Sequence, residues 1–159
     1  MIAPVSVEKP NMMLSKYFSL REMTKSQTAL RKNINNLPSG QHIENLSLLC
    51  ENILDPVREH FGKPFTPSSG YRSPALCKAI GSSVNSQHAK GEAADFEVAG
   101  IPNMELARWI VENLDFDQLI LEYYNSNDPS SGWVHCSYKR GENRKQVLRY
   151  DGKQYTHGL

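Results

Sequence analysis

The most regular pattern of apolar and polar positions lies between residues 43 and 61. Apolar side chains recur there mostly every three or four residues, at Ile43, Leu46, Leu49, Ile53, Val57 and Phe61. This spacing predicts an amphipathic helix, which Gly62 and Pro64 end. Pro56 lies inside the pattern and predicts a kink or a fresh first turn, because proline lacks the N–H group that a helix interior uses.

Three shorter segments also have helical patterns. Ser19, with Glu22 three residues later, has the spacing of a capping box and predicts a short helix within residues 18–32. The stretch PALCKAIG, residues 74–81, has proline at its start and glycine at its end. Residues 103–114, NMELARWIVENL, predict a second amphipathic helix.

Strand-like alternation dominates the second half of the chain. It covers residues 93–98, 116–124, 132–138 and 145–155, the last with Asp151-Gly152 as a hairpin-type turn. The stretch PFTPSSGYRS, residues 64–73, predicts one brief strand that runs into a loop. Helices first, then mostly consecutive strands, predict an α+β fold: a small central antiparallel sheet with helices packed on one side.

The composition fits a single domain over residues 1–159, of which residues 1–15 are expected to form a loose N-terminal arm. At 39% hydrophobic residues the chain can fill one core. A formal net charge of +1, with scattered lysine and arginine, argues against nucleic acid as a partner. No apolar run approaches the roughly 20 residues that span a bilayer, so membrane insertion is not expected.

The cysteines and the N-terminal stretch bear on the compartment. Cys50, Cys77 and Cys136 are odd in number and have no CxxC spacing, which argues against a disulfide framework or a thiolate zinc site. The opening MIAPVSVEKPNMM lacks the pattern of a secretory signal. We therefore expect a chain made in the cytoplasm without a signal peptide.

A set of polar residues could carry chemistry. The stretch NSQHAKGEAADFE places His88 and Asp95 seven residues apart around an expected turn. Asp95, Glu122 and His135 each lie on an expected strand, opposite an apolar face. A polar surface loop entering the sheet would explain the first stretch. The alternative is a mononuclear zinc hydrolase, which uses three nitrogen or oxygen ligands, a water and a nearby carboxylate.

Three ordered blocks add a resemblance. Residues 69–73 read Ser-Gly-Tyr-Arg-Ser, residues 86–96 read Ser-x-His-x-x-Gly-x-Ala-x-Asp-Phe, and residues 133–137 read Trp-Val-His-x-Ser. Together they resemble the zinc D-alanyl-D-alanine carboxypeptidase superfamily, in particular its small phage-type, endolysin-like peptidases. The segments FSLREMTKSQTA and ILDPVREHFG also resemble the family, so the resemblance covers almost the whole chain.

The resemblance implies a role for each matching residue. One Zn²⁺ per chain would be bound by His88, Asp95 and His135 on the open face of the sheet. Arg72 would be catalytic and substrate-binding, because it meets a carboxylate or carbonyl oxygen of the substrate. Tyr71 and Ser86 are the further candidate substrate contacts, and Ser86 is also expected to fix the turn by bonding a backbone amide.

One position departs from the family pattern. Many relatives have the catalytic glutamate three residues before the last zinc histidine, where this chain has Gly132. Several relatives with the same ending instead have a glutamate at the end of the preceding strand, which corresponds to Glu122. We expect Glu122 to be the general base, with Asp128 as the alternative.

The function implied is a zinc peptidase that hydrolyses a bond in peptidoglycan stem peptides. The sequence leaves open whether it is a D-Ala-D-Ala carboxypeptidase or an L-Ala–D-Glu type endopeptidase. The resemblance suggests a monomeric phage lysis enzyme that acts on the wall after release, although a host enzyme for recycled wall peptides would have the same features. The alternatives are a non-catalytic zinc-stabilised module that binds cell-wall peptide or protein, and a virion component.

Overall fold

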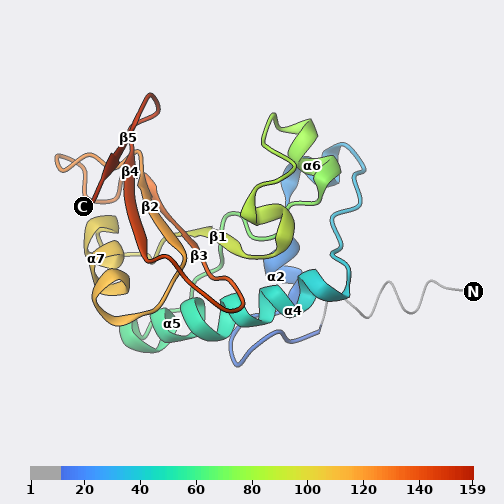
Figure 1. Ribbon diagram of the computed structural model, residues 1–159, viewed down its shortest axis with the longest axis horizontal. Helices are drawn as coiled ribbons and strands as arrows, with labels where there is room; N and C mark the ends of the chain where they lie inside the picture. The colour runs from blue at the N-terminus through green and yellow to red at the C-terminus, as the bar shows by residue number, and fades with distance from the viewer. Residues whose placement is uncertain (1–11) are drawn as a thin grey trace, which may run out of the picture.

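A computed structural model describes residues 12–159 as an α+β fold, which confirms the predicted class. A five-stranded sheet stands beside a lobe built around a short helix, α6, and a long helix runs along the base of both (Figure 1). Most of the expected N-terminal arm lies outside the described residues. Within its described part, Leu14 is buried and the Ser15 hydroxyl donates to the Asp55 carboxylate, so these two residues are not loose.

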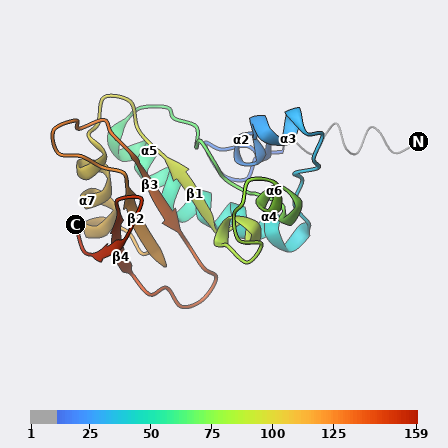
Figure 2. The same ribbon diagram turned by 90° about the horizontal axis from the view of Figure 1, so that it is seen from above.

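The sheet has the strand order β1-β3-β2-β4-β5 (Figure 2). Its strands are β1 (Ala93–Phe96), β2 (Gln118–Glu122), β3 (Trp133–Ser137), β4 (Gln146–Tyr150) and β5 (Tyr155–His157). Three neighbouring pairs are antiparallel, and β4 and β5 form the expected hairpin. The β2–β4 pair is parallel, so the sheet departs from the expected antiparallel arrangement at this one pair. The loop after β3 passes the start of β2 near Asp117, and β4 then runs along the far side of β2.

The long helix is continuous through a π-helical segment. It consists of α4 (Gly40–Leu49), the π-helical η2 (Cys50–Leu54) and α5 (Asp55–Phe61). The N–H of Asp55 donates to the carbonyl of Cys50, five residues back. Pro56 follows at the start of α5, where its missing N–H group breaks the ordinary hydrogen-bond ladder. The predicted discontinuity at Pro56 is thus met by a wider helical turn that precedes it.

The other helices are short except for one. They are α2 (Leu20–Thr24), α3 (Gln27–Arg31), α6 (Pro74–Ala79), the 3₁₀ turn η3 (Gln87–Lys90) and α7 (Asn103–Asn113). The capping box of Ser19 and Glu22 is confirmed. The strand expected within residues 64–73 is reduced to one isolated bridge, between Ser69 and Asp95.

The two faces of the sheet have different roles. Leu119, Leu121, Val134 and Cys136 point into the hydrophobic core, and α7 packs against β2 and β3. Alternation places Asp95, Ile120 and His135 in one row across the opposite face. All three cysteines are buried and unpaired. Within residues 12–159, no helix is long and apolar enough to cross a membrane.

Candidate metal centre

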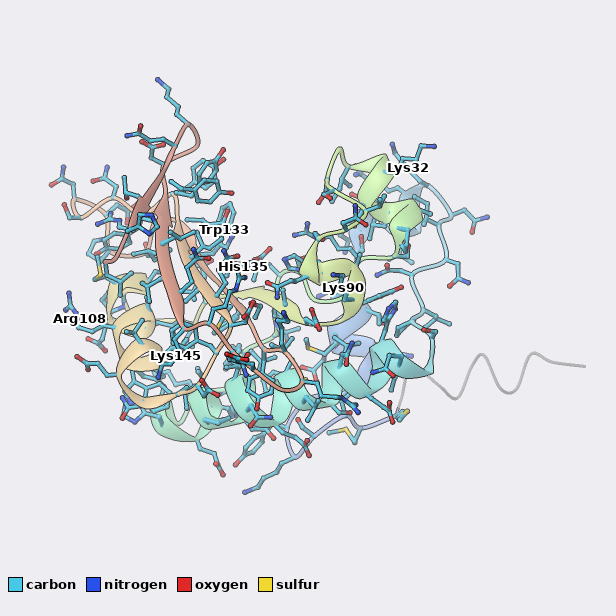
Figure 3. All side chains as sticks on the ribbon, in the orientation of Figure 1. Lys32, Lys90, Arg108, Trp133, His135 and Lys145 are labelled. Atoms are coloured by element: carbon cyan, nitrogen blue, oxygen red, sulfur yellow. The ribbon has the colours of Figure 1, made fainter. Side chains whose placement is uncertain are left out.

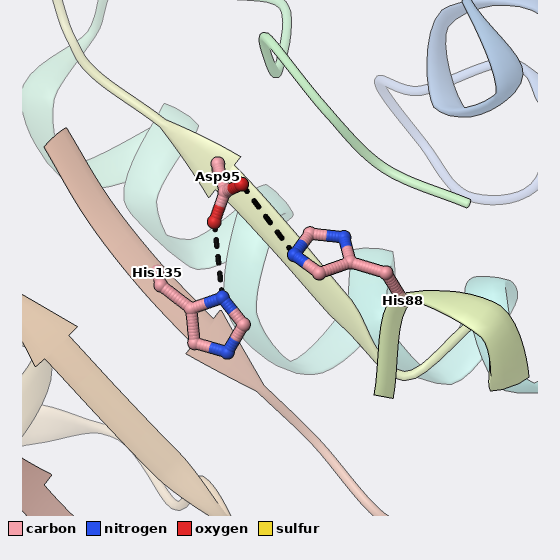
Figure 4. A group of neighbouring side chains, drawn as sticks. All are labelled: His88, Asp95 and His135. Carbon is pink, nitrogen blue, oxygen red and sulfur yellow. Dashed lines mark hydrogen bonds and ion pairs between the residues drawn. The ribbon is translucent and has the colours of Figure 1, made fainter. Parts of the chain in front are cut away.

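Three side chains from separate elements converge on the open face of the sheet (Figure 4). His88 comes from η3, Asp95 from β1 and His135 from β3, and the strand register sets Asp95 directly opposite His135. His135 Nδ1 lies 3.0 Å from Asp95 Oδ1, and His88 Nε2 lies 3.4 Å from Asp95 Oδ2. One donor atom from each residue falls within 4.8 Å of the others, so the structure brings the three expected ligands together.

The turn that carries His88 is fixed from several sides. His88 Nδ1 lies 2.7 Å from the Gly70 carbonyl oxygen, which can only accept, so Nδ1 carries the proton and Nε2 keeps a free lone pair. Gly91 ends the turn at a φ of 75°, in the left-handed region that favours glycine. Asn45 on α4 donates to the Lys90 carbonyl at 2.9 Å. The long helix therefore holds the 3₁₀ turn against the sheet.

Burial and hydrogen bonding favour the metal-binding forms of these groups. Burial alone would raise the pKa of the Asp95 carboxyl, but the hydrogen bond with His135 and the close contact with His88 outweigh it and hold that pKa well below its usual range. Burial lowers the pKa of His88, against the opposing pull of Asp95. The site therefore has an ionised carboxylate and a neutral imidazole at neutral pH. Two nitrogen donors and one oxygen donor fit the ligand set of a mononuclear zinc site with one position left open.

Arg72 lies on the edge of this centre. Its Nη2 donates to Asp95 Oδ2 at 3.0 Å, and its Nε donates to the Ser69 hydroxyl at 2.8 Å. The guanidinium is largely buried and lines a cleft of about 720 Å³ that the three candidate ligands also line. Arg72 thus orients the Asp95 carboxylate and presents a positive charge to whatever occupies the cleft.

Glu122 lies in the same cleft, at the end of β2. It pairs with Trp133 across the sheet, and the Trp133 indole N–H donates to Glu122 Oε2 at 3.2 Å. Burial, and then the charge of Asp95, raise the pKa of Glu122. By contrast Asp128 is exposed, accepts from the neighbouring Ser130 backbone, and is not among the residues that line the cleft.

The geometry explains the glycine that departs from the family pattern. Gly132 has a φ of 71°, and a Cβ atom there would collide with the Glu122 carbonyl oxygen. Position 132 therefore has no room for a glutamate side chain while β2 and β3 keep this pairing. The carboxylate on β2 occupies the same cleft as the three candidate ligands.

Of the two further residues expected to contact the substrate, Ser86 lines the cleft and Tyr71 does not. Ser86 lines the cleft, but its buried hydroxyl has no hydrogen-bond partner among the described residues, so the expected bond to a backbone amide was wrong. Tyr71 is only 4% exposed and packs in the core beside His42. It is not among the residues that line the cleft, and its contact with substrate stays a prediction.

Sequence reasoning missed an ion pair between the buried Asp117 and the largely exposed Arg144, which also line the cleft. Asp117, at 0% exposure, accepts from Arg144 Nη2 at 2.8 Å and from Gln87 Nε2 at 3.0 Å. Because Gln87 precedes His88, this network ties the turn of His88 to β2. No local sequence pattern indicates these contacts, since Asp117 is 27 residues from Arg144 and 30 from Gln87 in the sequence.

The cleft opens between the sheet and the lobe that carries η3 and α6. Figure 3 shows Trp133 and His135 on the side of the sheet that faces this lobe, with Lys90 on the opposite wall.

Comparison with known proteins gives one family. None of the curated proteins matches the chain. The family model of Peptidase M15 matches residues 16–137, a range that contains all three candidate ligands, Arg72 and Glu122. Since this match covers well over half of the 159 residues, the chain belongs to the Peptidase M15 family.

Proposed function

We propose that this zinc metallopeptidase hydrolyses a peptide bond in the stem peptides of bacterial peptidoglycan. The observation that carries the proposal is the single cleft lined by His88, Asp95, His135, Arg72 and Glu122. These residues supply a three-donor metal site, a cation and a carboxylate of raised pKa within one cavity. A metal-assisted amide hydrolase needs these three kinds of group close together.

The residues divide the chemistry between them. His88, Asp95 and His135 would hold the zinc ion, which when bound would supply Lewis acidity toward a carbonyl oxygen and a water molecule near neutral pH. Glu122, when ionised, accepts a proton from the attacking water and then delivers it to the leaving amine. Arg72 offers its positive charge to the oxygen that becomes negative as the carbonyl carbon turns tetrahedral.

The substrate and setting rest on the resemblance of the three sequence blocks to small phage-type peptidases. On that basis we propose that the chain acts as a monomer on the cell wall, as a phage lysis enzyme released from the cytoplasm. Both a D-Ala-D-Ala carboxypeptidase and an L-Ala–D-Glu endopeptidase fit a cleft that is open along the sheet.

A digest of purified peptidoglycan tests the proposal. The protein is assayed as isolated, after chelation and after zinc is restored, and released fragments are identified by mass spectrometry. We expect new fragments with zinc, their loss with chelator and their return, and the fragment masses name the bond. If zinc binds at one per chain and walls of several chemotypes release nothing, the non-catalytic binding module replaces this proposal.

A further inference from the structure

A row of four aromatic side chains crosses the open face of the sheet beside the candidate ligands. The register pairs Glu122 with both Trp133 and Tyr150, and pairs Tyr150 with Tyr155. Tyr123 joins the row, with its ring centroid 5.1 Å from that of Trp133 and 5.6 Å from that of Tyr150. Tyr150 and Tyr155 stack at 4.5 Å. We call Tyr123, Trp133, Tyr150 and Tyr155 the aromatic row.

The aromatic row is presented to solvent. Tyr155 is 58% exposed and Tyr123 is 47% exposed, which is unusual for large apolar side chains that also contact one another. Tyr123 has a φ of 56°, a left-handed conformation that costs a bulky residue free energy. The chain keeps this strained residue in the row, where its ring contacts those of Trp133 and Tyr150.

The aromatic row continues the cleft. Trp133 and Tyr155 line the same cavity as the candidate ligands. Along the strands, the aromatic row lies two residues, or about 7 Å, from the row of Asp95 and His135. Across the strands, Tyr155 lies three strand spacings, or about 14 Å, from His135. A peptide of about two to four extended residues spans that interval. One substrate can therefore occupy both places.

The chemistry of the aromatic row favours a sugar. Ring faces pack against the apolar C–H faces of a pyranose, while tyrosine hydroxyls meet its hydroxyl and acetamido groups. The Tyr123 and Tyr155 side chains are exposed, so their hydroxyls can reach the polar groups of a sugar. The charged group in the row is Glu122, whose carboxylate accepts from Trp133. An acidic polymer would need cations here, and a purely apolar side chain would leave the hydroxyls unused.

We infer that the aromatic row binds an N-acetyl sugar of the glycan strand that carries the stem peptide, so that the preferred substrate is sugar-linked peptide and not free peptide. This inference rests on the proposed function, because it names the substrate class of the same cleft. The sugar and the first residues of its peptide then lie along one path, from Tyr155 toward His135.

Two matched substrates test the inference. One is a muramoyl peptide, and the other is the same peptide with a simple acetyl group in place of the sugar. The wild-type enzyme should show a KM about three- to tenfold lower for the muramoyl peptide, the effect of one or two aromatic stacking contacts. Tyr155→Ala and Tyr123→Ala should bring the ratio of the two KM values close to one. Tyr17→Ala, beside Arg58 and Glu59 on α5, is the matched control and should keep the ratio.

A binding measurement separates this inference from the proposed function. Chitotetraose, a peptide-free chain of N-acetyl sugars, is titrated into the wild-type protein and into Tyr155→Ala by calorimetry. Saturable binding that Tyr155→Ala weakens supports the aromatic row even if no peptide is hydrolysed. Equal KM values for the two substrates, or no sugar binding at millimolar concentration, overturn it. A dimer in sedimentation that Tyr155→Ala dissociates also overturns it, because a second copy would then cover the row.

Discussion

Glu122 is the residue whose role the geometry makes easiest to isolate. It lines the cleft without being one of the three candidate ligands, and burial raises its pKa. We predict that Glu122→Gln leaves zinc bound but lowers kcat by about 10²- to 10⁴-fold, since the amide cannot accept a proton. Metal content by mass spectrometry and initial rates on a cleavable wall peptide measure the two effects.

The matched control is Asp128→Asn, which removes an exposed carboxylate outside the cleft. We expect its kcat to stay within about twofold of wild type, as for most surface substitutions. A near-normal rate for Glu122→Gln together with a large loss for Asp128→Asn would move the general base to the loop between β2 and β3.

Asp95 is the ligand that the other two contact. Asp95→Asn keeps the shape of the side chain but removes the charge that His88, His135 and Arg72 face. We predict that zinc affinity falls at least about 100-fold. Mutating a residue that only hydrogen-bonds to a metal ligand already lowers affinity by up to about 100-fold, and loss of the ligand's charge should cost more. Competition with a fluorescent zinc chelator gives the affinity, and zinc affinity equal to wild type would contradict the ligand assignment.

At the scale of elements, the turn between η3 and β1 sets the position of His88. A Cβ atom at Gly91 would lie 2.5 Å from the His42 carbonyl oxygen of α4, whereas a Cβ at Gly81, at a similar φ of 76°, would meet nothing within 4 Å. Both substitutions by alanine incur the cost of a left-handed backbone, about 1 kcal/mol. We predict that Gly91→Ala lowers the free energy of unfolding by at least about 1 kcal/mol more than Gly81→Ala.

The two alanine variants, Gly91→Ala and Gly81→Ala, should also differ in zinc affinity. Because Gly91 follows His88 by three residues, a displaced turn moves the imidazole away from Asp95, and zinc affinity should fall only in Gly91→Ala. Urea unfolding with and without zinc measures both quantities. Equal effects of the two alanines would mean that the contact between the turn and α4 is not what positions His88.

At the scale of the whole molecule, Asp117 links the sheet to the lobe that carries His88. Burial opposes its ionisation, but hydrogen bonds from Arg144 and Gln87 lower its pKa to about 2. An acid with a lowered folded-state pKa stabilises the fold above its unfolded value of about 3.9, and this stabilisation is lost as the pH falls toward 2. We predict that Asp117→Asn lowers the free energy of unfolding by about 2 to 3 kcal/mol at neutral pH and flattens its dependence between about pH 4 and 2.

Urea unfolding across that pH range, in the presence of chelator, measures the effect without the contribution of bound metal, and the metal ligands titrate alike in wild type and variant. Asp115→Asn is the control, because Asp115 is exposed and lies two residues away on the same segment. Parallel pH curves for wild type and Asp117→Asn would show that the ion pair with Arg144 contributes nothing to acid stability.

How far the sequence predicts this molecule depends on the range of the interaction. Alternation along one strand is local, so it correctly separated His135 from Cys136, and the capping box of Ser19 was visible in four residues. Strand pairing is not local, and nothing in the pattern showed that β4 would join β2 in parallel. For the same reason the buried network of Asp117 was missed.

The candidate site shows the same division. Sequence blocks predicted the three residues that the structure brings together, because residue identity and order carried the resemblance. They did not show that the Tyr71 side chain would pack in the core, since the direction of a side chain in an irregular segment depends on the core that forms around it. The collision that keeps position 132 a glycine depends on the twist between two strands and appears only in three dimensions.

The strand order has a consequence for how the chain assembles. β3 is inserted between β1 and β2, although it follows both of them in the sequence. His88 and Asp95 lie in η3 and β1, and His135 joins them only when β3 pairs between β1 and β2. A ligand that binds only the completed sheet stabilises that state by mass action and leaves earlier, partly paired states unaffected. Zinc would therefore stabilise the state in which β3 is paired on both sides, and its removal should lower the free energy of unfolding of the complete sheet.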